Sequence, residues 1–233
     1  MFATMLAANG ALSTLLLPRL VASQLRSDQA RGRYVRDVVP TIFVLWALAA
    51  TAMVAVLPPL LTAAAGERFA PATASLLVLC AVVPTSVVTS LYTVVFSLEK
   101  RLGRVVWYTA AMTVVNLALS FLLIPRYGAV GAAVGTAVSY AVAQVCYIWD
   151  QQAETTGVGG MWLVIVLCGI AQVWVGENPA ARAVWATVSG ATIAWTAKRT
   201  STVSAAVVER LFAGVLAPLG MVLRWMLVPK VVR

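Results

Sequence analysis

The side chains that could do acid–base or metal chemistry in this chain are few and scattered. The sequence contains no histidine, three cysteines and eight carboxylates. Cys80, Cys146 and Cys168 stand alone in apolar stretches, without the CxxC spacing that zinc sites use. The carboxylates fall between apolar stretches or at their ends, and none forms a paired acidic motif. The sequence therefore predicts no catalytic residue, no metal site and no cofactor, and we do not expect an enzyme.

The elements that carry these residues are long and apolar. Hydrophobic residues make up 61% of the 233 residues and charged ones 11%, with a mean hydropathy of +0.91, whereas soluble domains carry about 25% charged residues. Crossing a bilayer core takes roughly 20 residues of helix. The uncharged stretches of that length are residues 38–66, 69–98, 105–125, 127–149 and 155–176. They do not alternate in polarity as the strands of a membrane barrel do, so we expect an all-α fold.

We predict a polytopic transmembrane helix bundle with about seven spans and one further helix near the C-terminus. The expected spans are about 2–22, 39–61, 70–97, 105–124, 128–149, 158–176 and 179–197. Residues 201–233 form a basic, amphipathic segment. Its apolar part, 211–229, contains Arg224 and either lies at the membrane interface, which we favour, or forms an eighth span.

Connections rich in Arg and Lys alternate with poor ones. Residues 23–38 carry four arginines and residues 98–104 carry three basic side chains, so the positive-inside rule places both in the cytoplasm of a bacterium, with the spans in its cytoplasmic membrane. Asp150 and Glu154 depart from the pattern, because no basic residue accompanies them. The net charge of +9 lies in short connections beside the spans, which indicates membrane lipids as partners and excludes nucleic acid.

Three polar residues are the candidates for binding a substrate. Asn116 and Ser120 lie one turn apart on one face of a predicted helix. Arg19, near the inner end of the first predicted span, either binds a lipid pyrophosphate or extends to the head groups. No predicted span carries an ionisable Asp, Glu, Lys or Arg near its centre, which disfavours a proton- or sodium-coupled antiporter.

The segment 116–140 predicts a tight helical hairpin. Its first helix is expected to end at Ile124, and Pro125 and Gly128 turn the chain outside the membrane. Gly131 and Gly135 form a GxxxG pattern, which allows a neighbouring helix to approach closely.

This hairpin resembles that of the Wzx-type polysaccharide flippases, in the multidrug/oligosaccharidyl-lipid/polysaccharide exporter (MOP) superfamily. Three further segments are similar to features of the family and follow one another in the family's order. They are LLLPRL around Pro18, GERFAPA at 66–72 and the connection 98–104. The resemblance covers roughly residues 1–150. It implies the C-terminal portion of a flippase that translocates polyprenyl-linked oligosaccharide for cell-surface polysaccharide synthesis. Residues 1–150 would then belong to the second helix bundle and 151–200 to a further pair of spans.

A full member of this family has two bundles, and alternating access requires both. Because the resemblance covers only part of the second, we expect the chain to be truncated and to need a missing N-terminal half or a partner chain. Two alternatives stay open, which are a non-transporting membrane scaffold of a polysaccharide assembly complex and a fragment of a multidrug antiporter.

The alternation of charge predicts a topology that reporter fusions can measure. Fusions after Arg36 and after Arg104 are expected to report the cytoplasm, and a fusion near Glu67 the outside. An inverted result would show that the basic connections do not set the orientation.

Overall fold

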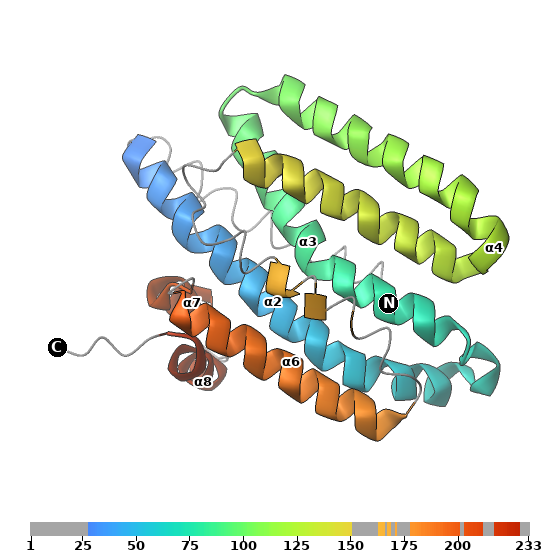
Figure 1. Ribbon diagram of the computed structural model, residues 1–233. Helices are drawn as coiled ribbons and strands as arrows, with labels where there is room; N and C mark the ends of the chain where they lie inside the picture. Colours follow the sequence, from blue (N-terminus) through green and yellow to red (C-terminus); the bar gives the residue numbers. More distant parts are fainter. Residues whose placement is uncertain are drawn as a thin grey trace.

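The computed structural model is helical throughout the residues that it describes, and the all-α prediction is confirmed for them. The described residues are 28–150, 163–165, 167–168, 171, 178–200, 203–211 and 217–228. Their elements are α2 (Asp28–Ala65), the 3-10 turn η1 (Glu67–Phe69), α3 (Ala72–Leu98), α4 (Leu102–Asp150), α6 (Pro179–Arg199), α7 (Ala205–Leu211) and α8 (Ala217–Leu227) (Figure 1). The predicted span 2–22, and most of 158–176, lie outside the described residues.

Helix α2 is longer than the predicted span 39–61. It starts at Asp28 and continues through Pro58 and Pro59. Each proline lacks the N–H that would bond the carbonyl four residues earlier, which belongs to Val54 for Pro58 and to Ala55 for Pro59. The Thr62 hydroxyl donates to the carbonyls of Pro58 and Pro59 themselves, at 3.3 and 3.0 Å. The helix ends at Ala65, and the next residue, Gly66, has a φ of 87° that glycine adopts at little cost.

Helix α3 agrees with the predicted span 70–97 to within two residues and is bent. Its two parts, Ala72–Cys80 and Val82–Ser97, meet at 41°. Pro84 has no N–H to donate to the Cys80 carbonyl, four residues earlier, and its ring crowds that position. The lost hydrogen bond accounts for the bend of α3.

Helix α4 is the predicted hairpin. Its backbone leaves helical geometry at Gly128, with φ 56° and ψ −132°, and the two arms lie side by side next to α3 (Figure 1). The predicted end of the first arm at Ile124 is three residues too early. Proline 125 removes a single hydrogen bond, and the chain reverses only at Gly128, where a left-handed φ is available without a Cβ clash.

The described part of the chain has the helices of a membrane protein. Residues 36–65 of α2, and α4, are long and apolar enough to cross a membrane, and the bent α3 makes a third if it counts as one span. Each arm of α4 alone exceeds the roughly 20 residues that a crossing needs. Helix α6 has 21 residues but is not among the candidates within the described residues. The count of seven spans is not confirmed and stays a prediction.

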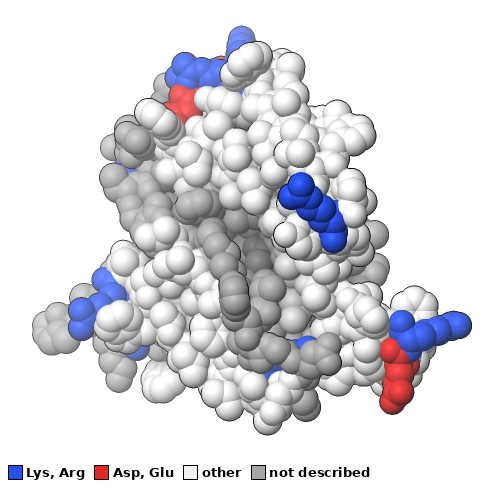
Figure 2. All heavy atoms as spheres, turned by 45° about the vertical axis from the view of Figure 1, so that its right-hand side comes forward, with Lys and Arg blue, Asp and Glu red and all other residues white. Residues whose placement is uncertain are grey.

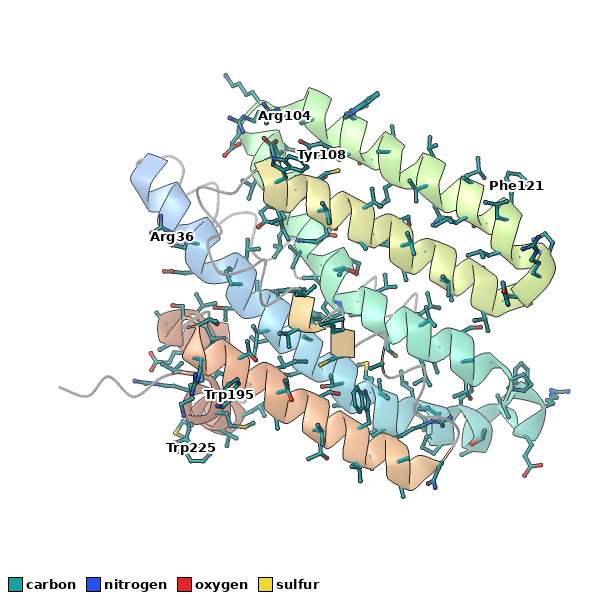
Figure 3. The ribbon with its side chains drawn as sticks, in the orientation of Figure 1. Arg36, Arg104, Tyr108, Phe121, Trp195 and Trp225 are labelled. Atoms are coloured by element: carbon teal, nitrogen blue, oxygen red, sulfur yellow. The ribbon has the colours of Figure 1, made fainter. Side chains whose placement is uncertain are left out.

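The core forms around α2, which packs against α3 on one side and α6 on the other (Figure 1). Large buried side chains of the core are Ile42, Phe43, Tyr92, Phe96 and Ile193. The hairpin joins this core through Ala143 and Tyr147 of its second arm and through Tyr108 and Met112 of its first arm. A buried stripe runs along that arm at every fourth residue, namely Gly131, Gly135, Ser139, Ala143 and Tyr147. The first arm faces outward, with Phe121 74% exposed (Figure 3).

The connections that the charge pattern assigns to one side of a membrane lie at one end of the bundle. Arg36, Arg104 and the end of α6 lie at the end opposite to η1 and Gly128 (Figures 1 and 3). The backbone N–H of Ser204 donates to the Thr41 hydroxyl at 3.0 Å, which ties the chain after α6 to α2 there. Over the face in Figure 2, charged side chains form small separate groups with uncharged surface between them. Which end faces the cytoplasm stays a prediction.

The close approach of the two arms predicts a strong effect of substituting Gly131. A Cβ there would lie 2.5 Å from the Leu123 carbonyl oxygen, so Gly131→Ala must push the arms apart. We expect it to lower the free energy of unfolding by more than about 1 kcal/mol, measured by denaturation in bicelles. Gly103→Ala, in open space, is the control and should be neutral or slightly stabilising. Equal effects of the two substitutions would contradict the close contact.

Candidate functional site between the arms of the hairpin

Asn116 is the centre of a polar cluster between the two arms of α4. Its Nδ2 donates to the Ser139 hydroxyl at 3.2 Å and to the Thr136 hydroxyl at 3.5 Å. Its Oδ1 accepts from the Ser120 hydroxyl at 3.2 Å. The side chain is half-buried, and both ends of the amide are engaged. The cluster thus joins the first arm to the second by neutral hydrogen bonds.

The predicted binding residues fall into two groups. The structure brings Asn116 and Ser120 together and directs them toward the second arm. A ligand that binds there would have to replace the hydrogen bonds of Asn116 to Ser139 and Thr136. Arg19 lies outside the described residues. The sequence did not single out the partnership with Thr136 and Ser139. For Ser139 a signal was available, because Asn116 and Ser139 are nearly equally far from Gly128 along the chain, and such residues face each other across a hairpin.

A row of hydroxyls follows one side of α3 and reaches the hairpin at Thr93. We call it the hydroxyl ladder, and its members are Thr85, Ser86, Thr89, Ser90, Thr93 and Ser97. At the helical period these residues share a sector of about 140°. Each hydroxyl donates to a carbonyl one turn earlier, at 2.6–3.0 Å. The Thr93 hydroxyl also lies 3.2 Å from the Tyr147 hydroxyl of the second arm.

Gln144 adds an amide on the buried side of the second arm. Its side chain is fully buried, and within the described part of the chain neither Nε2 nor Oε1 has a hydrogen-bond partner. Leaving a buried amide unsatisfied costs about 1–3 kcal/mol for each group. Gln144 therefore has hydrogen-bonding capacity that the described residues do not use.

Four aromatic rings close the hairpin at the end opposite Gly128. Tyr147 stacks on Tyr92 at 5.7 Å and contacts Phe96 and Tyr108 at 5.5 and 5.1 Å between ring centroids. These rings come from α3 and from both arms of α4. Aromatic pairs of this kind contribute about 0.5–1.5 kcal/mol beyond their buried area. The cluster therefore holds the open end of the hairpin against α3.

An ion pair beside this cluster explains the departure of Asp150 from the charge pattern. The Asp150 carboxylate is paired with the Arg104 guanidinium and accepts a hydrogen bond from the Tyr108 hydroxyl at 3.1 Å (Figure 3). The connection that follows Asp150 lacks a basic residue, but Arg104, from the connection 98–104, neutralises the Asp150 charge across the hairpin. The pair is half-exposed at Arg104, so its net contribution is small.

The polar groups of the hairpin are neutral donors and acceptors, which suits them to bind hydroxyl- or amide-bearing ligands. Elsewhere in the described residues, no three carboxylates or thiols gather closely enough to hold a metal ion. No protein-family model, curated protein or solved structure matches the chain.

The Asn116 cluster predicts measurable coupling between the arms. In a double-mutant cycle, Asn116→Ala and Ser139→Ala should couple by about 0.6–1.7 kcal/mol of unfolding free energy, the range for hydrogen bonds between membrane helices. Thr113→Ala is a matched control, because that exposed hydroxyl bonds only to Thr109 of its own arm. A coupling energy of zero for Asn116 and Ser139 would show that the bonds contribute nothing to the hairpin.

Proposed function

We propose that the chain is part of a membrane transport protein that translocates polyprenyl-linked oligosaccharide across the bacterial cytoplasmic membrane. The observation that supports this proposal is the set of neutral polar groups on α3 and α4, which are the hydroxyl ladder, Gln144 and the Asn116 cluster. These groups lie on helices whose outward faces are apolar. Sugars bind through many hydroxyl hydrogen bonds, and neutral Ser, Thr, Asn and Gln side chains exchange such bonds without removing an ion from water.

The resemblance to Wzx-type flippases supplies the substrate class. It rests on the hairpin 116–140 and on turn residues in the same order along residues 1–150. Since the resemblance covers one of the two bundles that alternating access requires, we propose that the chain transports only with a further bundle. That bundle would complete the path beside the hydroxyl ladder and the hairpin.

The position of the charges favours a flippase over a multidrug antiporter. Within the described parts of α2, α3 and α4, ionisable Asp, Glu, Lys and Arg residues lie in the first ten residues of α2, at the ends of α4 or beside Gly128. Ion-coupled transporters carry acidic residues at membrane depth. Energy coupling would therefore depend on residues outside these helices.

The outward face of the first arm of α4 favours the alternative of a membrane scaffold. Trp107, Leu117 and Phe121 are well exposed on it. Such a face contacts either lipid or another membrane helix. A scaffold, however, has no need of a buried amide such as that of Gln144, which has no hydrogen-bond partner among the described residues, and for this reason transport is the proposal that we prefer.

Glycan export in a flippase-null strain tests the proposal. The chain alone should not restore surface polysaccharide, whereas co-expression with an N-terminal flippase half should. In the co-expressed pair, Thr89→Val with Thr93→Val should lower export about fivefold or more, since each lost hydrogen bond is worth about 1 kcal/mol.

Thr113→Val is the matched control and should leave export unchanged, because its hydroxyl is exposed on the outward side of the first arm. Restoration by the chain alone would refute the need for a second bundle. Failure of every pairing, with all chains present in the membrane, would refute the flippase assignment and favour the scaffold.

A further inference from the structure

Two exposed tryptophans, Trp195 of α6 and Trp225 of α8, each lie beside a basic side chain from the last turn of α6. The Trp195 and Trp225 side chains are 59% and 70% exposed. The Arg199 guanidinium lies 4.5 Å from the centroid of the Trp195 ring, and the Lys198 ammonium 5.9 Å from that of Trp225. Lys198 also donates to the Trp225 carbonyl at 3.5 Å. Figure 3 shows both tryptophans at the same end of the bundle.

Helix α8 contributes Trp225 and lies against the protein by one side. It packs on α6 and α7, and Arg224 is ion-paired with Glu209 of α7. Its 11 residues rise about 16 Å, roughly half of a hydrocarbon core. As described, α8 is too short to cross a membrane, and it folds back on α7, which favours the interfacial position for this part of 211–229.

The other side of α8 is apolar and exposed. Met221, Val222 and Trp225 are well exposed on it, whereas Leu227 is buried against the core. Val188 and Trp195 continue an exposed apolar surface along α6. Helices with one such face and cationic flanks lie in the head-group region, where tryptophan rings also concentrate.

The charge of this surface selects the lipid. The described surface carries three basic residues and one carboxylate, namely Lys198, Arg199, Arg224 and Glu209. It therefore has a surplus of two positive charges. In the sequence of residues 198–233, six basic residues accompany that one carboxylate. A zwitterionic head group offers no net attraction to this surplus, whereas an anionic phospholipid does.

We propose that Trp195, Lys198, Arg199 and Trp225 form a binding site for the head group of an anionic phospholipid. The guanidinium of Arg199 binds the phosphate by two parallel hydrogen bonds, and Lys198 supplies a second cation. The tryptophan rings hold both cations in place by cation–π contacts. The acyl chains pack along the exposed apolar side of α6. This site does not depend on the proposed transport function.

Native mass spectrometry of the full chain tests the site. The protein is released from micelles containing equal amounts of phosphatidylglycerol and phosphatidylcholine, and the adducts of each lipid are counted. Wild type should prefer phosphatidylglycerol. The preference should fall about fivefold for each cation removed in Lys198→Gln and Arg199→Gln, and Lys198→Arg should keep it.

The opposite end of the bundle supplies a matched control. Arg68 lies over the Phe69 ring at 5.2 Å, and Arg68→Gln should leave the preference unchanged. Equal adduct ratios in wild type, or an equal loss in Arg68→Gln, would overturn the site. Dimers that disappear in Trp225→Ala would show that this surface binds a second copy of the chain and would also overturn it. Circular dichroism checks that each variant keeps its helix content.

Discussion

The register of the hairpin depends on one backbone contact, the approach of Gly131 to the Leu123 carbonyl. Only a residue without a Cβ fits there, because the added atom would meet the backbone of the first arm and would force the two arms apart. Once the arms meet at this point, the helical rise fixes every pair further from the turn. Asn116 then faces Ser139, Tyr108 faces Tyr147, and Arg104 faces Asp150. This contact therefore selects one pairing of the two arms, which the apolar residues of the hairpin would not specify by themselves.

The hairpin keeps its neutral polar groups between helices and its large apolar side chains on the outward face of the first arm. In lipid, apolar side chains gain little by leaving their surroundings, so close packing and hydrogen bonds between helices supply the attraction. The Asn116 cluster and the contact between Thr93 and Tyr147 lie between helices, whereas the outward face of the first arm carries Trp107 and Phe121. The groups that hold the helices together are also the ones able to bind a polar substrate, which links stability to the proposed transport path.

Both ends of the bundle hold a cation beside an aromatic ring, and one end also holds the pair of Arg104 with Asp150. At the end with Gly128, Arg68 lies over the Phe69 ring, and Arg126 lies in the last turn of the first arm of α4. At the other end, cations are tied to aromatic rings or carboxylates, through Arg104 with Asp150 and Arg199 with Trp195. Aromatic rings and cations together suit a membrane interface, where one side of a residue is apolar and the other is wet. A head-group site at this end would fix the depth of α6 and α8 relative to the lipid.

The sequence by itself determined the features that have local causes. The length of the apolar stretches predicts helices that can cross a membrane. The missing N–H of Pro84 causes the bend of α3, and the positive φ that Gly128 can adopt allows the reversal of α4. Only the tertiary structure decided that α2 continues through Pro58 and Pro59, that Asn116 bonds the second arm, and that Asp150 is paired with Arg104. Each of these outcomes depends on which side chains the fold brings within a few ångströms, and hydrogen bonds and ion pairs act only at that range.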